Sequence, residues 1–200
     1  MTKTYDPALT PPHAQRRREH ARDDEWTRAF LRRAPIGHVV TQWGDQPFIN
    51  PTTFWYDEPN QRLIFHSNIV GRVRANSEHA DRVCFAASEF GRFLPSNVAL
   101  EFSVQYRSVV VYGRVRVLES DDEKRAGLSG LIGKYFGHMT AGEAYRPITE
   151  QELKRTSVYA IEIEYWSGKE NWPEQADQSD EWPALPHELL TPPRPTNESH

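Results

Sequence analysis

The chain has 200 residues, of which 38% are hydrophobic and 12% aromatic, enough for one folded domain with short tails. Its formal net charge of −4 argues against non-specific nucleic-acid binding, which needs a basic surface. The single cysteine, Cys84, excludes an internal disulfide, and its apolar neighbours predict a buried structural thiol. No apolar run reaches membrane-spanning length. We therefore expect a cytoplasmic protein without nucleic-acid or membrane partners.

The two ends of the chain differ in composition from its middle. Residues 1–20 are polar and contain three prolines, which predicts a flexible N-terminal arm. Residues 172–200 contain six prolines, which predicts an extended or partly disordered C-terminal tail. The folded domain is therefore assigned to residues 21–171.

The first predicted element is a helix over residues 24–33. Asp23 or Asp24 can cap its start, and Trp26, Phe30 and Leu31 recur at helical spacing. Because proline cannot continue a helix, Pro35 marks the end.

Short strands joined by tight turns follow, which is typical of an antiparallel meander. The predicted strands are 36–42, 48–56, 63–67, 82–88, 101–119 and 158–166, with a loop over 89–100. Helices are predicted at 71–78 and 120–135, and a short one opens at Thr149; Ser120–Glu123 and Thr149–Glu152 are capping boxes. Gly113 predicts a bulge in the long strand. The chain lacks a Rossmann glycine fingerprint, so we expect a mainly β fold, a small β-barrel with flanking short helices.

The stretch from Leu63 to Arg72 carries the clearest chemical signal. An apolar strand ends in His66 and Ser67, turns through Gly71, and enters a helix that begins with Arg72. A helix N-terminus offers free N–H groups, and an arginine fork suits phosphate, so the stretch predicts a monophosphate cradle. Arg74 and the pair Thr52-Thr53 could complete it. The alternative is that Ser67 only caps the helix and Arg72 is a surface charge.

The order of these motifs resembles the pyridoxamine 5'-phosphate oxidase family, and within it the 5-nitroimidazole-resistance (Nim) reductases. The segments that carry the resemblance are Arg33–Gly37, Pro47–Tyr56, Phe65–Arg72, Tyr106–Arg114 and Gly168–Asn171. The resemblance covers about two-thirds of the chain and implies an FMN-binding split β-barrel that is homodimeric, with the flavin at the subunit interface.

The resemblance also implies roles for individual residues. The site residues that it implies are Asn50, Thr52 and Thr53 along the flavin ring and ribityl chain, His66 and Ser67 beside the flavin, Arg72 at the phosphate, and Ser108 and Trp166 reaching in from the other subunit. The family often has a second basic residue after the first, whereas this chain has Val73, so Arg74 would have to compensate.

His66 is the predicted catalytic residue, because an imidazole can supply the proton that accompanies electrons from a flavin. The alternative is a histidine that only hydrogen-bonds a backbone carbonyl. Tyr135, Phe136, His138, Met139 and Tyr145 form an aromatic cluster that either packs on the barrel mouth or covers a flat substrate. No histidine pair has metal-ligand spacing, so no metal site is predicted.

The leading hypothesis is an FMN-dependent reductase that converts small nitroaromatic compounds, such as 5-nitroimidazoles, to amines and so confers drug resistance. One alternative is another oxidoreductase of this fold, which oxidises pyridoxamine phosphate or uses a deazaflavin or haem. Another is a non-catalytic flavin-binding module.

Overall fold

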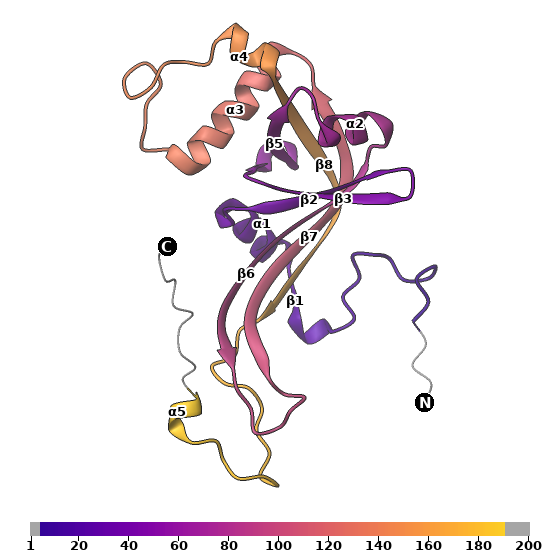
Figure 1. Cartoon of the computed structure of the whole chain (residues 1–200), viewed down its shortest axis with the longest axis vertical. Coiled ribbons are helices and arrows are strands. Elements are labelled where there is room, and N and C mark those ends of the chain that lie inside the picture. The colour runs from indigo at the N-terminus through magenta and orange to yellow at the C-terminus, as the bar shows by residue number, and fades with distance from the viewer. Residues whose placement is uncertain (1–4, 191–200) are drawn as a thin grey trace.

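An antiparallel sheet forms the body of the protein, which the computed structural model describes over residues 5–190 (Figure 1). Its strands are β1 (Ala21–Arg22), β2 (Gly37–Trp43), β3 (Gln46–Thr52), β4 (Trp55–Asp57), β5 (Arg62–Asn68), β6 (Arg82–Leu94), β7 (Ser103–Leu118) and β8 (Thr156–Asn171). They pair in the order β3-β2-β6-β7-β8-β5-β4, and β1 pairs with β8. The predicted mainly β fold is thus confirmed.

Short helices surround the sheet, and local sequence explains where most of them begin. The helices are α1 (Asp24–Arg33), α2 (Arg72–His79), α3 (Asp121–Phe136), α4 (Glu150–Arg155) and α5 (His187–Leu190), with 3-10 turns η1 (Arg18–His20) and η2 (Glu58–Asn60). Asp23, Ser120 and Thr149 cap α1, α3 and α4, and the capping box of Thr149 and Glu152 is complete. Across residues 5–190, no helix is long and apolar enough to cross a bilayer.

The connection from β3 to β4 brings the two edges of the sheet together. Among residues 5–190, β3 pairs only with β2 and β4 only with β5, so the two strands lie at opposite ends of the sheet order. Only Thr53 and Phe54 separate them, a distance of roughly 10 Å at full extension. The sheet must therefore curl until its edges nearly meet at this crossover, which is the architecture of a split barrel.

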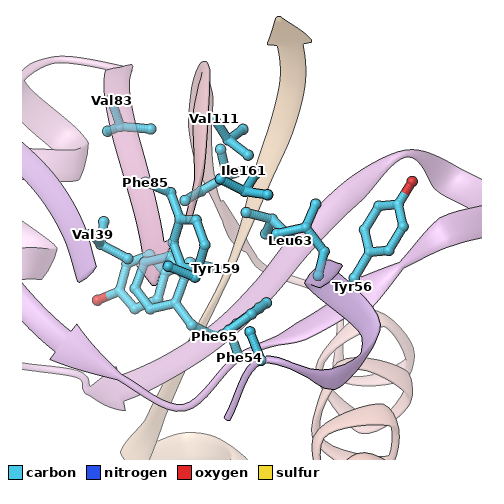
Figure 2. Close-up of a cluster of buried hydrophobic side chains, with 14 of the residues drawn as sticks. Val39, Phe54, Tyr56, Leu63, Phe65, Val83, Phe85, Val111, Tyr159 and Ile161 are labelled. Carbon is cyan, nitrogen blue, oxygen red and sulfur yellow. The ribbon is translucent and has the colours of Figure 1, made fainter. Parts of the chain in front are cut away.

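The interior of the curled sheet holds one large hydrophobic cluster. The rings of Phe65 and Tyr159 stack with their centroids 4.7 Å apart. Figure 2 shows them close to Phe54 and Phe85. Phe54 meets Phe85 edge-on at 4.7 Å. A smaller cluster on the outer face of β5 and β8 packs under α3 and contains Ile64, Leu118, Leu131, Val158 and Ala160.

The far ends of β6 and β7 form a hairpin that extends away from α3 and α4 (Figure 1). Residues 172–183 lie along it: Arg92 pairs with Glu174 at 2.6 Å, and Asn97 bonds the carbonyl of Ser179 at 2.8 Å. The N-terminal arm crosses the outer face of the sheet, where His13 stacks on Tyr165 at 4.5 Å.

Strand bounds depart from the sequence prediction in several places; β8, for example, runs from Thr156 to Asn171, beyond the predicted strand 158–166. The predicted strand 48–56 is divided into β3 and β4, because the chain must cross from one sheet edge to the other. The first half of the predicted loop 89–100 is strand, since β6 continues to Leu94 alongside β7. The bulge at Gly113 is confirmed: the register with β8 shifts there, and a Cβ on Gly113 would lie 2.1 Å from the Glu162 carbonyl oxygen.

Candidate functional site

The junction of β5 and α2 presents unsatisfied hydrogen-bond donors. Gly71 precedes the helix with a φ of +148°, a conformation that residues other than glycine rarely adopt. No side chain caps α2, and the N–H groups of its first turn donate to no acceptor within residues 5–190. A helix N-terminus carries partial positive charge, so this junction is suited to an anion.

The basic residues in the first turn of α2 make this junction more favourable for an anion. Helices α1, α3 and α4 each have acidic residues in their first turn, as the helix dipole favours. The first turn of α2 has none and instead contains Arg72 and Arg74. These positive charges repel the positive end of the helix, and a bound anion would relieve that repulsion.

The two arginines are in different environments. Arg72 is exposed, and its side chain has no ion-pair or hydrogen-bond partner among the described residues. Arg74 bonds Glu78 at 2.6 Å and Ser157 at 3.3 Å, and it lies 3.5 Å from Glu119. Val73, between them, is buried in the main cluster. Arg72 is thus free for a ligand, whereas the charge of Arg74 is shared with two carboxylates.

His66 and Ser67 point to opposite faces of β5, because successive strand residues alternate. Ser67 shares the face of Phe65 and exchanges a hydrogen bond with the Tyr159 hydroxyl at 3.0 Å. His66 shares the face of Ile64, under α3. The edge of β5 is unpaired from Phe65 onward within the described residues, since β4 begins at Trp55, opposite Ile64. A ligand that contacts both side chains must therefore lie along this open edge.

The environment of His66 tunes its acidity. The residue is exposed, yet partial desolvation by surrounding protein lowers its pKa below the ordinary 6.5. The ring is therefore mostly neutral at pH 7, and the protonated form is a stronger acid than free imidazole. Such a group can give a proton to a reduced substrate, most readily under mildly acidic conditions.

Asn50 and Thr52 lie on the inner side of β3, half-buried and paired with Val39 and Gly37. The Thr52 hydroxyl donates to the carbonyl of Thr53 at 3.0 Å, and Thr53 is the first residue of the crossover. β3 leads directly into the crossover and β5 follows it through β4, and no hydrogen bond among the described residues joins Asn50 or Thr52 to Ser67.

Ser108 and Trp166 lie far along the sheet from this opening. Val158, the partner of His66, pairs with Leu118 on β7, and Ser108 is ten residues away, about 33 Å along the strand. Trp166 donates its indole N–H to Asp24 at 2.7 Å and lies under Arg28. One chain therefore does not bring these two residues to the β5–α2 junction.

Two other features complete the description of reactive groups. Cys84, predicted to be buried, is only half-buried and borders a cavity of about 500 Å³ with Tyr112 and Tyr165; burial raises the pKa of its thiol. Over residues 5–190, no group of three His, Cys, Asp or Glu side chains is arranged to hold a metal ion.

Sequence reasoning missed Tyr159 and Lys134. The Tyr159 hydroxyl meets Ser67, but within an alternating strand this tyrosine has the pattern of an ordinary core residue. The Lys134 ammonium contacts backbone near the crossover, and a lysine near a helix end otherwise indicates a solvated charge.

Several solved structures share this fold, among them proteins described as binding flavin and haem. The flavocytochrome Anf3 from Azotobacter vinelandii superposes with a TM-score of 0.72 at 23% identity, over 94% of this chain and 89% of that chain. An FAD and haem binding protein from Mycobacterium smegmatis gives 0.69 at 21% identity, over 80% and 76%. A candidate 5-nitroimidazole antibiotic resistance protein from Bacteroides thetaiotaomicron gives 0.62 at 19% identity, over 74% and 83%.

These identities are low, so the structures show a shared fold and nothing more specific. No curated protein sequence matches the chain. The family model for pyridoxamine 5'-phosphate oxidase matches residues 23–170, which span α1 and all strands from β2 to β8. The chain therefore belongs to the pyridoxamine 5'-phosphate oxidase family.

Proposed function

We propose that this protein binds FMN at the split of its barrel and reduces small nitroaromatic compounds such as 5-nitroimidazoles to amines. The observation that carries the proposal is the uncapped start of α2, with Gly71 at a φ of +148° and an exposed, unpartnered Arg72 within the described residues. Free N–H groups and a guanidinium together match a phosphate monoester.

The remaining polar groups suit the rest of the cofactor. Ser67 and Tyr159 offer hydroxyls on the inner face, and Asn50 and Thr52 border the opposite side of the opening. The open edge of β5 offers backbone groups that a flat, polar ring system can meet. Bound FMN would supply the electrons, which it would receive from an external donor.

Reduction of a nitro group to an amine takes six electrons and six protons and releases two waters, so His66 would relay protons from solvent through a ring nitrogen, since it lies on the strand that borders the proposed cofactor site. Because burial lowers its pKa, the rate should fall as the pH rises through that pKa, below the ordinary 6.5, where the protonated form is lost. Drug resistance would follow where reduction inactivates the nitro compound.

We further propose that the working unit is a homodimer. Ser108 lies on the outer face of the sheet, about 33 Å along β7 from the row of His66, so it could contact a flavin only in another subunit. Trp166 is held by α1 at a similar remove. Size-exclusion chromatography with light scattering gives the mass directly, and a monomer would contradict this assignment.

The first experiment is the absorption spectrum of the purified protein before and after FMN is added and the sample is desalted. Retained flavin bands, with FMN rather than FAD in the denatured supernatant, would support the proposal. FAD in the supernatant would extend the cradle to a dinucleotide, and a Soret band would indicate haem. A colourless protein that retains no flavin would refute FMN binding.

Turnover separates the enzyme from a flavin-binding module. Reduction of a 5-nitroimidazole by the FMN-loaded protein, followed by loss of nitro absorbance with a chemical reductant, should exceed that of free FMN. His66→Gln should lose at least about tenfold in rate while retaining FMN. His187→Gln, at the exposed start of α5, is the matched control. A module that only binds flavin would show no rate above free FMN.

A further inference from the structure

Two consecutive residues in the last turns of α3 contact the β3–β4 crossover. Lys134 donates to the Ala34 carbonyl at 2.8 Å and the Leu31 carbonyl at 3.4 Å, and its ammonium lies 3.6 Å from the centre of the Phe54 ring. The ammonium therefore joins three elements: α3, the C-terminal end of α1, and the crossover.

Tyr135 holds the backbone of the same crossover residue. Its hydroxyl accepts from the Phe54 N–H at 3.0 Å, and its single proton serves the carbonyl oxygens of Phe54 and Pro35 at 2.9 and 2.7 Å. Gly130, one turn earlier, permits close approach, since a Cβ there would lie 2.1 Å from the Trp55 ring. Both residues that follow Thr53 are thus fixed against α3.

Partial burial at this position disfavours the charged form of a lysine side chain. Lys134 is partly buried, and desolvation alone lowers its pKa to about 8, with no carboxylate offsetting the burial. Backbone carbonyls at the negative end of α1 and the face of an aromatic ring are what stabilise the charge. A more apolar side chain would pack here at less cost, so folding does not explain the lysine.

The contacts of Lys134 and Tyr135 fix the position of the β3–β4 crossover, which borders the proposed cofactor opening. Thr52 and Thr53 immediately precede Phe54, and only the crossover connects the two sheet edges there. A shift of Phe54 would move the edge of β3 relative to the open edge of β5. The separation of these edges determines whether a flat ring can contact both.

We infer that Lys134 and Tyr135 are positioning residues that hold the Phe54 crossover, and with it Thr52 and Thr53, in the geometry that accepts FMN. The inference rests on the proposed function, because it assigns how the same site is kept open. Neither side chain needs to touch the cofactor, since both act through Phe54.

The charge of Lys134 then couples cofactor binding to pH. The charged or titratable side chains on the elements around this turn include Arg32, Arg33, Tyr135, Asp57, Arg62 and His66. Arg32 and Arg33 pair with Glu58 and Glu89, and Asp57 pairs with Arg62. The pKa of Tyr135 is raised by burial and that of His66 is lowered, so both titrate outside pH 7–9. A phosphate monoester also titrates below this window.

The test measures FMN dissociation constants by flavin fluorescence at pH 7 and pH 9, together with visible circular dichroism of bound FMN. Lys134→Met should raise the Kd at pH 7 by about tenfold, without lowering the melting temperature, because it removes a poorly solvated charge. Tyr135→Phe, which deletes only the hydroxyl, should also raise the Kd and alter the dichroism. Lys124→Met, on α3 but with no side-chain partner among the described residues, is the matched control and should bind FMN normally.

The pH dependence of FMN binding is measured on the wild-type protein, with Lys134→Met as the comparison. The wild-type Kd should rise about threefold to tenfold between pH 7 and pH 9, and Lys134→Met should be flat over that range. If both variants bind FMN with wild-type Kd and dichroism, the positioning role is overturned while the FMN site stands. If the wild-type protein retains no FMN, the proposed site is wrong and the positioning role falls with it.

Discussion

The start of α2 and the last turns of α3 each carry a basic side chain, but they treat its charge in opposite ways. Arg72 lies at the positive end of a helix, exposed and without an acidic neighbour in the first turn. Lys134 lies at the negative end of α1, where two backbone carbonyls accept hydrogen bonds from its ammonium and the Phe54 ring lies against it. The guanidinium of Arg72 has no hydrogen-bond acceptor among the described residues, whereas the ammonium of Lys134 donates to backbone carbonyls of the same chain.

This contrast separates two roles that sequence alone does not distinguish. A cation that is repelled by its own helix dipole gains most when an anion arrives, so it suits ligand binding. A cation whose donors are satisfied by backbone cannot bind a ligand without releasing that backbone, so it suits positioning. Variants at the start of α2 and at Lys134 test the two halves of this contrast.

The largest effect is expected from charge reversal at the open end. Arg72→Glu should raise the Kd for FMN about 100-fold, because it removes charge-assisted hydrogen bonds and adds repulsion. Arg82→Glu, another exposed arginine with only a 3.8 Å ion pair to Glu164, should change the Kd little. Equal loss in both variants would indicate general electrostatic attraction and no specific cradle.

The conformation of Gly71 gives the next largest effect. At a φ of +148°, Gly71→Ala should destabilise the protein by about 1–3 kcal/mol and weaken FMN binding, although no atom lies within 4 Å of the new Cβ. Gly133→Ala, in α3 with equally open space, should instead stabilise by up to about 1 kcal/mol. Urea denaturation measures both, and an unchanged stability for Gly71→Ala would show that the turn relaxes.

The partly buried cation should leave a signature in the pH dependence of stability. The Lys134 pKa is 10.5 ordinarily and about 8 in the fold, so between these values the unfolded chain binds more protons. Stability from this group therefore rises as the pH increases from 8 toward 10.5, by less than about 1.4 kcal/mol per pH unit because the side chain keeps some solvent. Subtracting the Lys134→Met profile isolates the effect; identical profiles would contradict the assigned pKa.

Arg74 should show the smallest effect. Its charge is shared with Glu78 and Glu119, and exposed ion pairs contribute little. Arg74→Ala should therefore cost less than about 1 kcal/mol and raise the Kd for FMN less than tenfold. A loss as large as that of Arg72→Glu would show that Arg74 leaves its carboxylates to bind the phosphate.

Local rules predicted the helices of this protein well. The caps at Asp23, Ser120 and Thr149 depend on residues within one turn of each other, so their spacing in the sequence is enough to locate them. The same holds for the turn at Gly71. The division between β3 and β4 was not predicted, since residues 48–56 were assigned to one returning strand and only the pairing partners separate its two halves.

The candidate site was predictable in part, for the same reason. Ser67, Gly71 and Arg72 are neighbours in sequence and in space. Strand alternation predicts that His66 and Ser67 point to opposite faces of β5. The open edge that both residues border depends on where the pairing of β4 with β5 stops. Tyr159 and Lys134 reach the site from distant segments, and neither carries a local signal.

By itself, the sequence determined the mainly β class, the helix starts and the chemistry of the β5–α2 junction, because each depends on side chains a few positions apart. Only the tertiary structure decided that β3 and β4 close the barrel from opposite edges and that α3 holds their crossover. It also decided that Arg72 stays free while Arg74 and Lys134 do not. These outcomes depend on contacts between segments up to about a hundred residues apart, and nothing in local spacing encodes which partner a charge will meet.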